Sequence, residues 1–83
     1  MEQNVEMNQD LGKYIEYRIG IELGGSFESC VRRDYDRNYI AFFGLGTAAA
    51  GWIRHWCTRN DVPVPSEEER DEIACRLLGW QRW

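Results

Sequence analysis

The segment KYIEYRIGIEL, residues 13 to 23, alternates apolar and polar side chains, and it restricts the fold of this chain more than any other feature. Every second position in it is apolar, namely Ile15, Tyr17, Ile19, Ile21 and Leu23. Period two places all five side chains on one face of a β-strand. A helix would instead turn Tyr17 and Ile21 away from Ile15 and Ile19. The segment therefore predicts a strand with one buried face.

A helix and a second strand are expected next. The glycines of GGS, residues 24 to 26, permit a sharp turn. Apolar residues then recur at helical spacing over 27 to 37, and a strand in the same place is the competing interpretation. Residues 39 to 45, YIAFFGL, form a short continuous apolar run, which is typical of a strand buried on both faces.

A further helix is predicted over residues 47 to 60. Its apolar positions follow the helical period, so Trp52, Ile53 and Trp56 are expected in the core. The two prolines of NDVPVP, residues 60 to 65, cannot continue that helix, and each biases its predecessor to an extended conformation.

The last helix is predicted to begin after Ser66. Ser66 and Glu69 have the spacing of a capping box, in which the serine accepts a hydrogen bond from a backbone N–H of the first turn. Gly79 is expected to end the helix early. Its buried stripe is predicted to contain Ile73, Ala74, Leu77 and Leu78.

These elements predict a small α/β (α+β) fold in the order β-α-β-α-α. A short two- or three-stranded sheet would pack against two or three helices. Residues 1 to 12 would be a loosely ordered lead-in, and residues 13 to 83 would form a single compact domain. So small a sheet leaves an open edge, which a missed strand or a second copy in a homodimer would complete.

Charge and cysteine usage exclude several functions. The net charge is −4, which opposes direct binding to nucleic acid or to an anionic membrane. The first ten residues lack the basic and the apolar regions of a signal peptide, and the three cysteines, an odd number, form no C-x-x-C pair. We therefore expect a cytoplasmic protein with reduced thiols, and no membrane segment, because the uncharged run from residue 39 to 53 is too short.

No group of residues in the sequence has the pattern of an active site. The glycines of FFGLGTAAAG have the spacing of a dinucleotide-binding turn, but no second parallel strand follows them. His55 and Cys57 would point about 200° apart on a helix, which opposes both a zinc site and a catalytic pair. We therefore predict no enzymatic activity, no cofactor and no metal.

The acidic run PSEEERDE, residues 65 to 72, is the main candidate for a binding function. Carboxylates in the first turn of a helix are favoured by the helix dipole, but five of them exceed what that turn needs. The tryptophans near the end of the chain are of the residue type enriched at interfaces. The residues predicted to contact a partner are Glu67, Glu68, Asp71, Glu72, Asp61, Trp80 and Trp83.

The function expected from these features is that of a small acidic binding protein. It would occupy the basic, nucleic-acid-binding surface of a partner protein. A phage or mobile-element inhibitor of host defence, such as an anti-CRISPR protein, is the specific hypothesis, by analogy of size and charge alone. The alternative is a bacterial accessory subunit or small regulatory protein that binds another protein without imitating nucleic acid.

Overall fold

The chain folds into five helices in the computed structural model, which describes residues 2 to 80 and the side chains from residue 11 onward. In chain order they are α1 (Glu2–Leu23), α2 (Phe27–Asp34), α3 (Arg37–Phe43), α4 (Leu45–Arg59) and α5 (Glu67–Leu78). The described residues form no strand. The expected α/β (α+β) fold with its small sheet is therefore wrong, and so is the order β-α-β-α-α.

The predicted strand over residues 13 to 23 is the second half of α1. Ile15 and Ile19, four residues apart, are completely buried, whereas Tyr17 and Ile21 are 65% and 63% exposed. A helix separates these two pairs as the helical period requires. The alternation was misleading because two apolar side chains of this segment stay in solvent. The backbone of residues 2 to 12, expected to be a lead-in, belongs to the same helix.

The predicted strand over residues 39 to 45 is also helical, and it is divided between two helices. Asp36 begins α3, since its Oδ1 accepts a hydrogen bond from the backbone N–H of Asn38 at 2.9 Å. Gly44 ends it with a φ of 100°, a conformation that a residue with a side chain rarely adopts. The apolar run indicated burial on both faces, but α3 contains no buried residue.

The helices predicted around residues 27 to 37, 47 to 60 and after Ser66 are confirmed as α2, α4 and α5. In α4, Trp52, Ile53 and Trp56 are buried as expected. The Ser66 hydroxyl accepts from the N–H of Glu69 at 3.2 Å, and Gly79 ends α5 in the left-handed region. Ile73 and Ala74 are buried in the predicted stripe, whose two leucines are half-buried.

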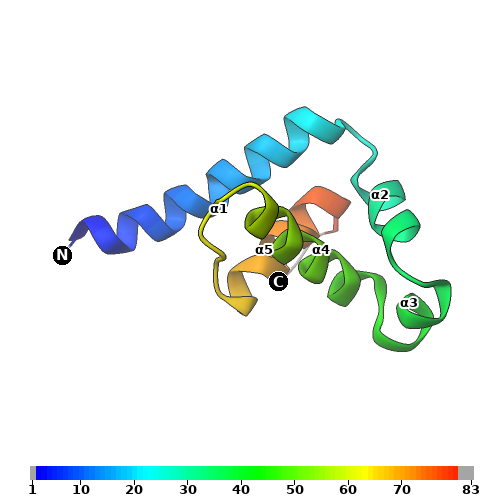
Figure 1. Cartoon of the computed structure of the whole chain (residues 1–83). Coiled ribbons are helices and arrows are strands. Elements are labelled where there is room, and N and C mark those ends of the chain that lie inside the picture. Colours follow the sequence, from blue (N-terminus) through cyan, green and yellow to red (C-terminus); the bar gives the residue numbers. More distant parts are fainter. Residues whose placement is uncertain (1, 81–83) are drawn as a thin grey trace.

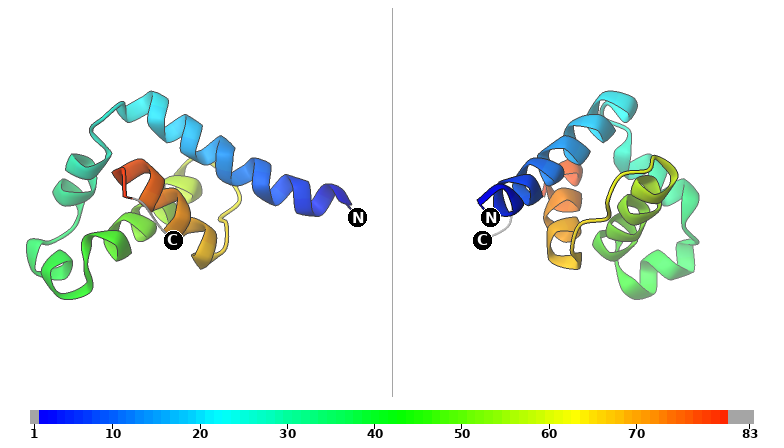
Figure 2. Two further views of the ribbon diagram at one scale, coloured as in Figure 1. Left: turned by 180° about the vertical axis from the view of Figure 1, so that it is seen from behind. Right: turned by 60° about the vertical axis from the view of Figure 1, so that its left-hand side comes forward.

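Helix α5 lies between α1 and α4 and contacts both of them. The short helices α2 and α3 pack on α4 at the end of the molecule far from the N-terminus, and the N-terminal half of α1 extends beyond the other helices (Figure 1, Figure 2). The result is an elongated body of 43 × 27 × 20 Å. None of the described helices is long and apolar enough to cross a lipid bilayer.

The core is centred on the two buried tryptophans of α4. The ring of Trp52 meets Phe27 of α2 edge to face at 5.4 Å, and its Nε1 donates to Asp34 at 2.8 Å. Trp56 donates from Nε1 to Glu22 of α1 at 3.1 Å. Each indole thus has its polar atom bonded to a partly exposed carboxylate, which is the usual condition for burying a tryptophan.

Candidate interaction surface

The most exposed large apolar side chain among the described residues belongs to α3. Phe42 is 82% exposed and Phe43 is 53% exposed. Tyr39 lies beside them at 37%, and Tyr35 precedes the helix in a half-buried position. These four side chains, Tyr35, Tyr39, Phe42 and Phe43, are called the aromatic row below.

The rings of the aromatic row contact one another in sequence. Tyr35 and Tyr39 have ring centroids 5.2 Å apart, and Tyr39 and Phe43 are 4.7 Å apart. Phe42 meets Phe43 edge to face, also at 4.7 Å. The row arises because α3 packs on the core mainly through Ile40. The helical period turns Phe42 to the opposite side, and Tyr39 and Phe43 are also left partly in solvent. A row of touching rings is a preformed apolar surface.

Tyr35 anchors the aromatic row to α4. If Gly51 carried a Cβ, that atom would lie 2.5 Å from the Tyr35 hydroxyl, so only glycine lets the ring lie this close to α4. Burial raises the pKa of the Tyr35 hydroxyl, as does Tyr39, whereas the positive charge of Arg54 opposes the rise. The hydroxyl is therefore a neutral hydrogen-bonding group at neutral pH.

A small cleft opens beside Tyr35. Its volume is about 390 Å³, and it is lined by Asp34, Tyr35, Trp52, His55 and Arg59. The hydrogen bond from Trp52 lowers the pKa of Asp34, and Arg33 and Arg59 act in the same direction against desolvation. Asp34 is therefore ionised at neutral pH, and its two oxygens are already engaged by Trp52 and by Arg33.

The cleft does not contain the groups that nucleophilic catalysis needs. His55 is exposed on the outer side of α4, while Cys57 is fully buried on the opposite side, where burial raises the pKa of its thiol. A buried thiol of raised pKa is a poor nucleophile. Among the described side chains, those of residues 11 to 80, no three from His, Cys, Asp or Glu are grouped so that they could hold a metal ion.

Four of the five predicted acidic residues lie in the first half of α5, and they differ in exposure. Glu67, Glu68 and Glu72 are exposed and Asp71 is half-buried. Asp61 is exposed in the turn after α4, with a φ of 59°. Residues 62 to 66 separate Asp61 from the start of α5, and Glu72 lines a cleft against α1.

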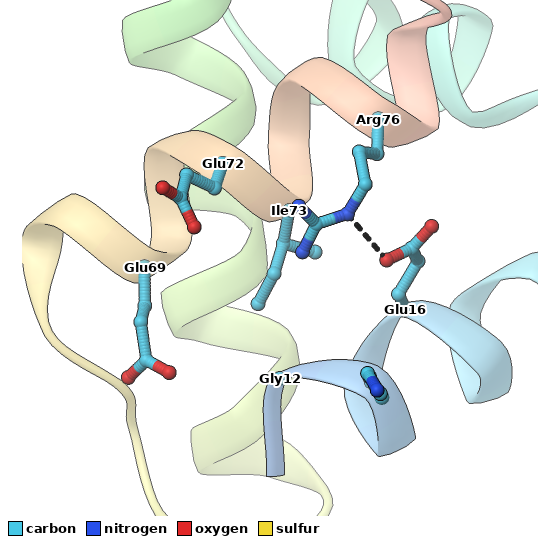
Figure 3. Close-up of a pocket in the computed structure, with 7 residues that line it drawn as sticks. Gly12, Glu16, Glu69, Glu72, Ile73 and Arg76 are labelled. Atoms are coloured by element: carbon cyan, nitrogen blue, oxygen red, sulfur yellow. Dashed lines mark hydrogen bonds and ion pairs between the residues drawn. The ribbon is translucent and has the colours of Figure 1, made fainter. Parts of the chain in front are cut away.

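That second cleft, between α1 and α5, is crossed by an ion pair. Arg76 donates from Nε to Glu16 at 2.7 Å, with Ile73, Glu69 and Glu72 beside it on α5 (Figure 3). Both partners of the pair are partly exposed, so it contributes about 1 kcal/mol or less. The cleft is therefore lined mainly by charged side chains of the two helices, and two of them, Glu69 and Glu72, come from the predicted acidic run.

The predicted tryptophans are separate from the acids. Trp80 is 46% exposed and follows the far end of α5, and twelve helical residues span about 18 Å. Its ring lies against Gly46, where a Cβ would approach it to 3.2 Å. Gly46 is in the first turn of α4, directly after α3, so Trp80 belongs to the same end of the molecule as the aromatic row. Trp83 lies outside the described residues.

Sequence reasoning missed the aromatic row as a site. The signal that could have found it was Asp36, which is a favoured N-cap residue placed before YIAFF. A helix started there turns Phe42 to the side opposite Ile40. A second exposed apolar strip, which comprises Tyr14, Tyr17 and Ile21 on α1, was missed because residues 13 to 23 were expected to form a strand.

Comparisons of the chain with protein-family models, with curated proteins and with solved structures find no match to any of them.

Proposed function

We propose that this chain is a non-enzymatic binding protein that docks on another protein through the aromatic row. The observation that carries the proposal is the exposure of Phe42, at 82%, within a series of rings already in contact. Burying one phenylalanine side chain is worth about 1.5–3 kcal/mol, so a small domain leaves such groups in water at a clear cost. Aromatic anchors of this kind dominate the energetics of protein interfaces.

The geometry of α3 supports docking rather than a role in the core. The seven residues of this helix bury no side chain completely, so its exposed rings, Tyr39, Phe42 and Phe43, contribute little to folding. Its ring contacts order the side chains before a partner arrives, which reduces the entropy lost on binding. This corresponds to the accessory or regulatory protein that binds without imitating nucleic acid.

The test is affinity capture from a nuclease-treated lysate with matched variants. Phe42→Ser removes the most exposed ring, and Ile21→Ser removes an apolar side chain of similar exposure, 63%, from α1. Proteins captured by the wild type should be retained by Ile21→Ser and lost with Phe42→Ser. Both variants should keep the wild-type circular dichroism spectrum. If Phe42→Ser captures the same proteins in the same amounts, the aromatic row is not the docking surface.

A second candidate function rests on the acidic start of α5. Glu67, Glu68 and Glu72 are exposed and form no ion pair with any described residue. Arg70, the one basic residue of the run, donates instead to the backbone oxygen of Pro65 at 2.7 Å. This end could occupy a basic groove that normally holds nucleic acid, as in an inhibitor carried by a phage or mobile element.

The acidic hypothesis has its own test. The triple change Glu68→Gln, Asp71→Asn and Glu72→Gln should leave the fold intact, because surface substitutions usually cost within about 0.5 kcal/mol each. It should slow association with the captured partner and flatten the salt dependence of that rate, since charges at the edge of an interface act mainly on association. If the association rates of the wild type and the triple variant are the same at low and at high salt concentration, these acids serve only to stabilise the helix.

A further inference from the structure

The aromatic row has a basic border on α4, and this border indicates what its partner looks like. Arg54, His55 and Arg59 are all exposed on the outer side of that helix. None of them forms an ion pair with another described residue. They are called the basic border below.

The basic border and the aromatic row are continuous through Tyr35. His55 and Arg59 line the same cleft as Tyr35, and the charge of Arg54 acts on the Tyr35 hydroxyl. The rings then continue from Tyr35 to the exposed phenylalanines. An apolar surface and a positively charged one thus meet at a single side chain.

The carboxylates near this border do not neutralise it. Asp34 accepts hydrogen bonds from Trp52 and from Arg33, and Asp36 accepts one from the first turn of α3. Arg33 pairs with Asp34, and the charge of Arg59 also acts on that carboxylate. The arginines at 33, 37, 54 and 59 nevertheless outnumber the two carboxylates, so positive charge remains in excess. The excess is local, because the whole chain carries a net charge of −4.

We propose that the partner presents an acidic segment with apolar side chains, whose apolar groups cover the aromatic row and whose carboxylates face Arg54 and Arg59. This inference rests on the proposed function and names the chemistry of the partner. Arginine pairs with carboxylates in a bidentate geometry, and opposite charges at an interface steer association and set the register of the partner.

Charge distinguishes this partner from two others. Single-stranded nucleic acid also stacks on aromatic rings, but a long polyanion is repelled by the net negative charge of the chain. A second copy could offer its own acidic run. The apolar residues that follow that run, Ile73 and Ala74, are however buried in its core, and Val64 before it, 43% exposed, is smaller than the rings that it would have to cover.

The experiment uses labelled peptides of about 14 residues, long enough for nearly four helical turns. One peptide combines Glu or Asp with Leu and Phe at helical spacing, a second replaces its acids by Lys, and a third replaces its apolar residues by Ser. An oligothymidylate of equal length is the nucleic-acid probe. Fluorescence anisotropy should show binding of the acidic apolar peptide, and affinity at least about tenfold weaker for the other three probes, which corresponds to 1.4 kcal/mol.

The matched variants remove two arginines in different places. Arg54→Gln with Arg59→Gln should weaken the acidic apolar peptide at least about tenfold and flatten its salt dependence. Arg32→Gln with Arg76→Gln changes the net charge equally but alters arginines outside the surface, so it should leave the affinity within about twofold. Circular dichroism checks that both double variants are folded.

The outcomes separate the inference from the proposed function. If Phe42→Ser abolishes partner capture but the lysine peptide binds as well as the acidic one, the aromatic row is confirmed and the acidic partner is refuted. Preferential binding of the oligothymidylate, or failure of the acidic peptide to bind, also overturns the inference. So does concentration-dependent self-association in sedimentation velocity that Arg54→Gln with Arg59→Gln removes, because the occupant is then a second copy.

Discussion

Replacing Trp56 by alanine tests the packing of the helix at the centre of the fold. Trp56 is 2% exposed, its Nε1 donates to Glu22 at 3.1 Å, and the Arg18 guanidinium lies 5.4 Å from the ring centroid. Truncation of a buried aromatic side chain costs about 3–5 kcal/mol. The lost hydrogen bond adds little, since Glu22 is partly exposed and is solvated again. A domain of this size has a total stability of about 4–12 kcal/mol, so this loss is a large part of it.

The assay is thermal unfolding followed by circular dichroism. One kcal/mol shifts the Tm of a domain this small by about 4–8 °C, so Trp56→Ala should lower it by about 12 °C or more. Arg54→Ala, on the exposed side of the same helix, is the control and should cost within about 0.5 kcal/mol. A Tm for Trp56→Ala within about 4 °C of the wild type would show that α4 does not bury this face.

Four further substitutions test local features of the fold. Gly20→Ala should stabilise the fold by about 0.5–1 kcal/mol, because nothing lies within 4 Å of the added Cβ. Gly51→Ala should destabilise it by about 1–3 kcal/mol, because its Cβ would meet the Tyr35 hydroxyl. Urea unfolding of both variants checks that the two changes in stability have opposite signs. Ser66→Ala should lose about 0.5–2 kcal/mol with the cap of α5, and an unchanged midpoint in the same assay would contradict that role. The folded-state pKa of Asp34 is lowered, chiefly by the hydrogen bond from Trp52, so its contribution to stability is present above the unfolded pKa of about 3.9 and is lost as the pH falls through the lower folded pKa. Asp34→Asn should therefore have a lower Tm than the wild type at neutral pH, and the difference in Tm should shrink in acid. A difference in Tm that does not change with pH would refute this.

The candidate site was only partly predictable from the sequence. Glu67, Glu68 and Glu72 are exposed, as their residue type predicts, whereas Glu69 and Asp71 are half-buried. Trp80 was identified by its residue type, but its place beside Gly46 depends on how α5 packs on α4. The row of rings on α3 was interpreted as a buried strand, because sequence patterns assign apolar residues to the core by default.

The sequence by itself determined the elements whose signals do not depend on burial elsewhere. Ser66 begins α5 through the hydrogen bond that its side chain accepts, and Gly79 ends it through its backbone freedom. The helical spacing around Trp52 and Trp56 identified α4. Such signals are local, so a single chain segment contains all of the information.

Only the tertiary structure decided the character of α1 and α3. In residues 13 to 23 the same letters fit a strand if all five apolar side chains are buried, and a helix if Tyr17 and Ile21 remain in solvent. In α3 the question was likewise whether Phe42 and Phe43 are covered. Burial is a property of the assembled helices: α5 covers one face of α1 and α4 covers one face of α3, and apolar side chains on the uncovered faces stay in solvent.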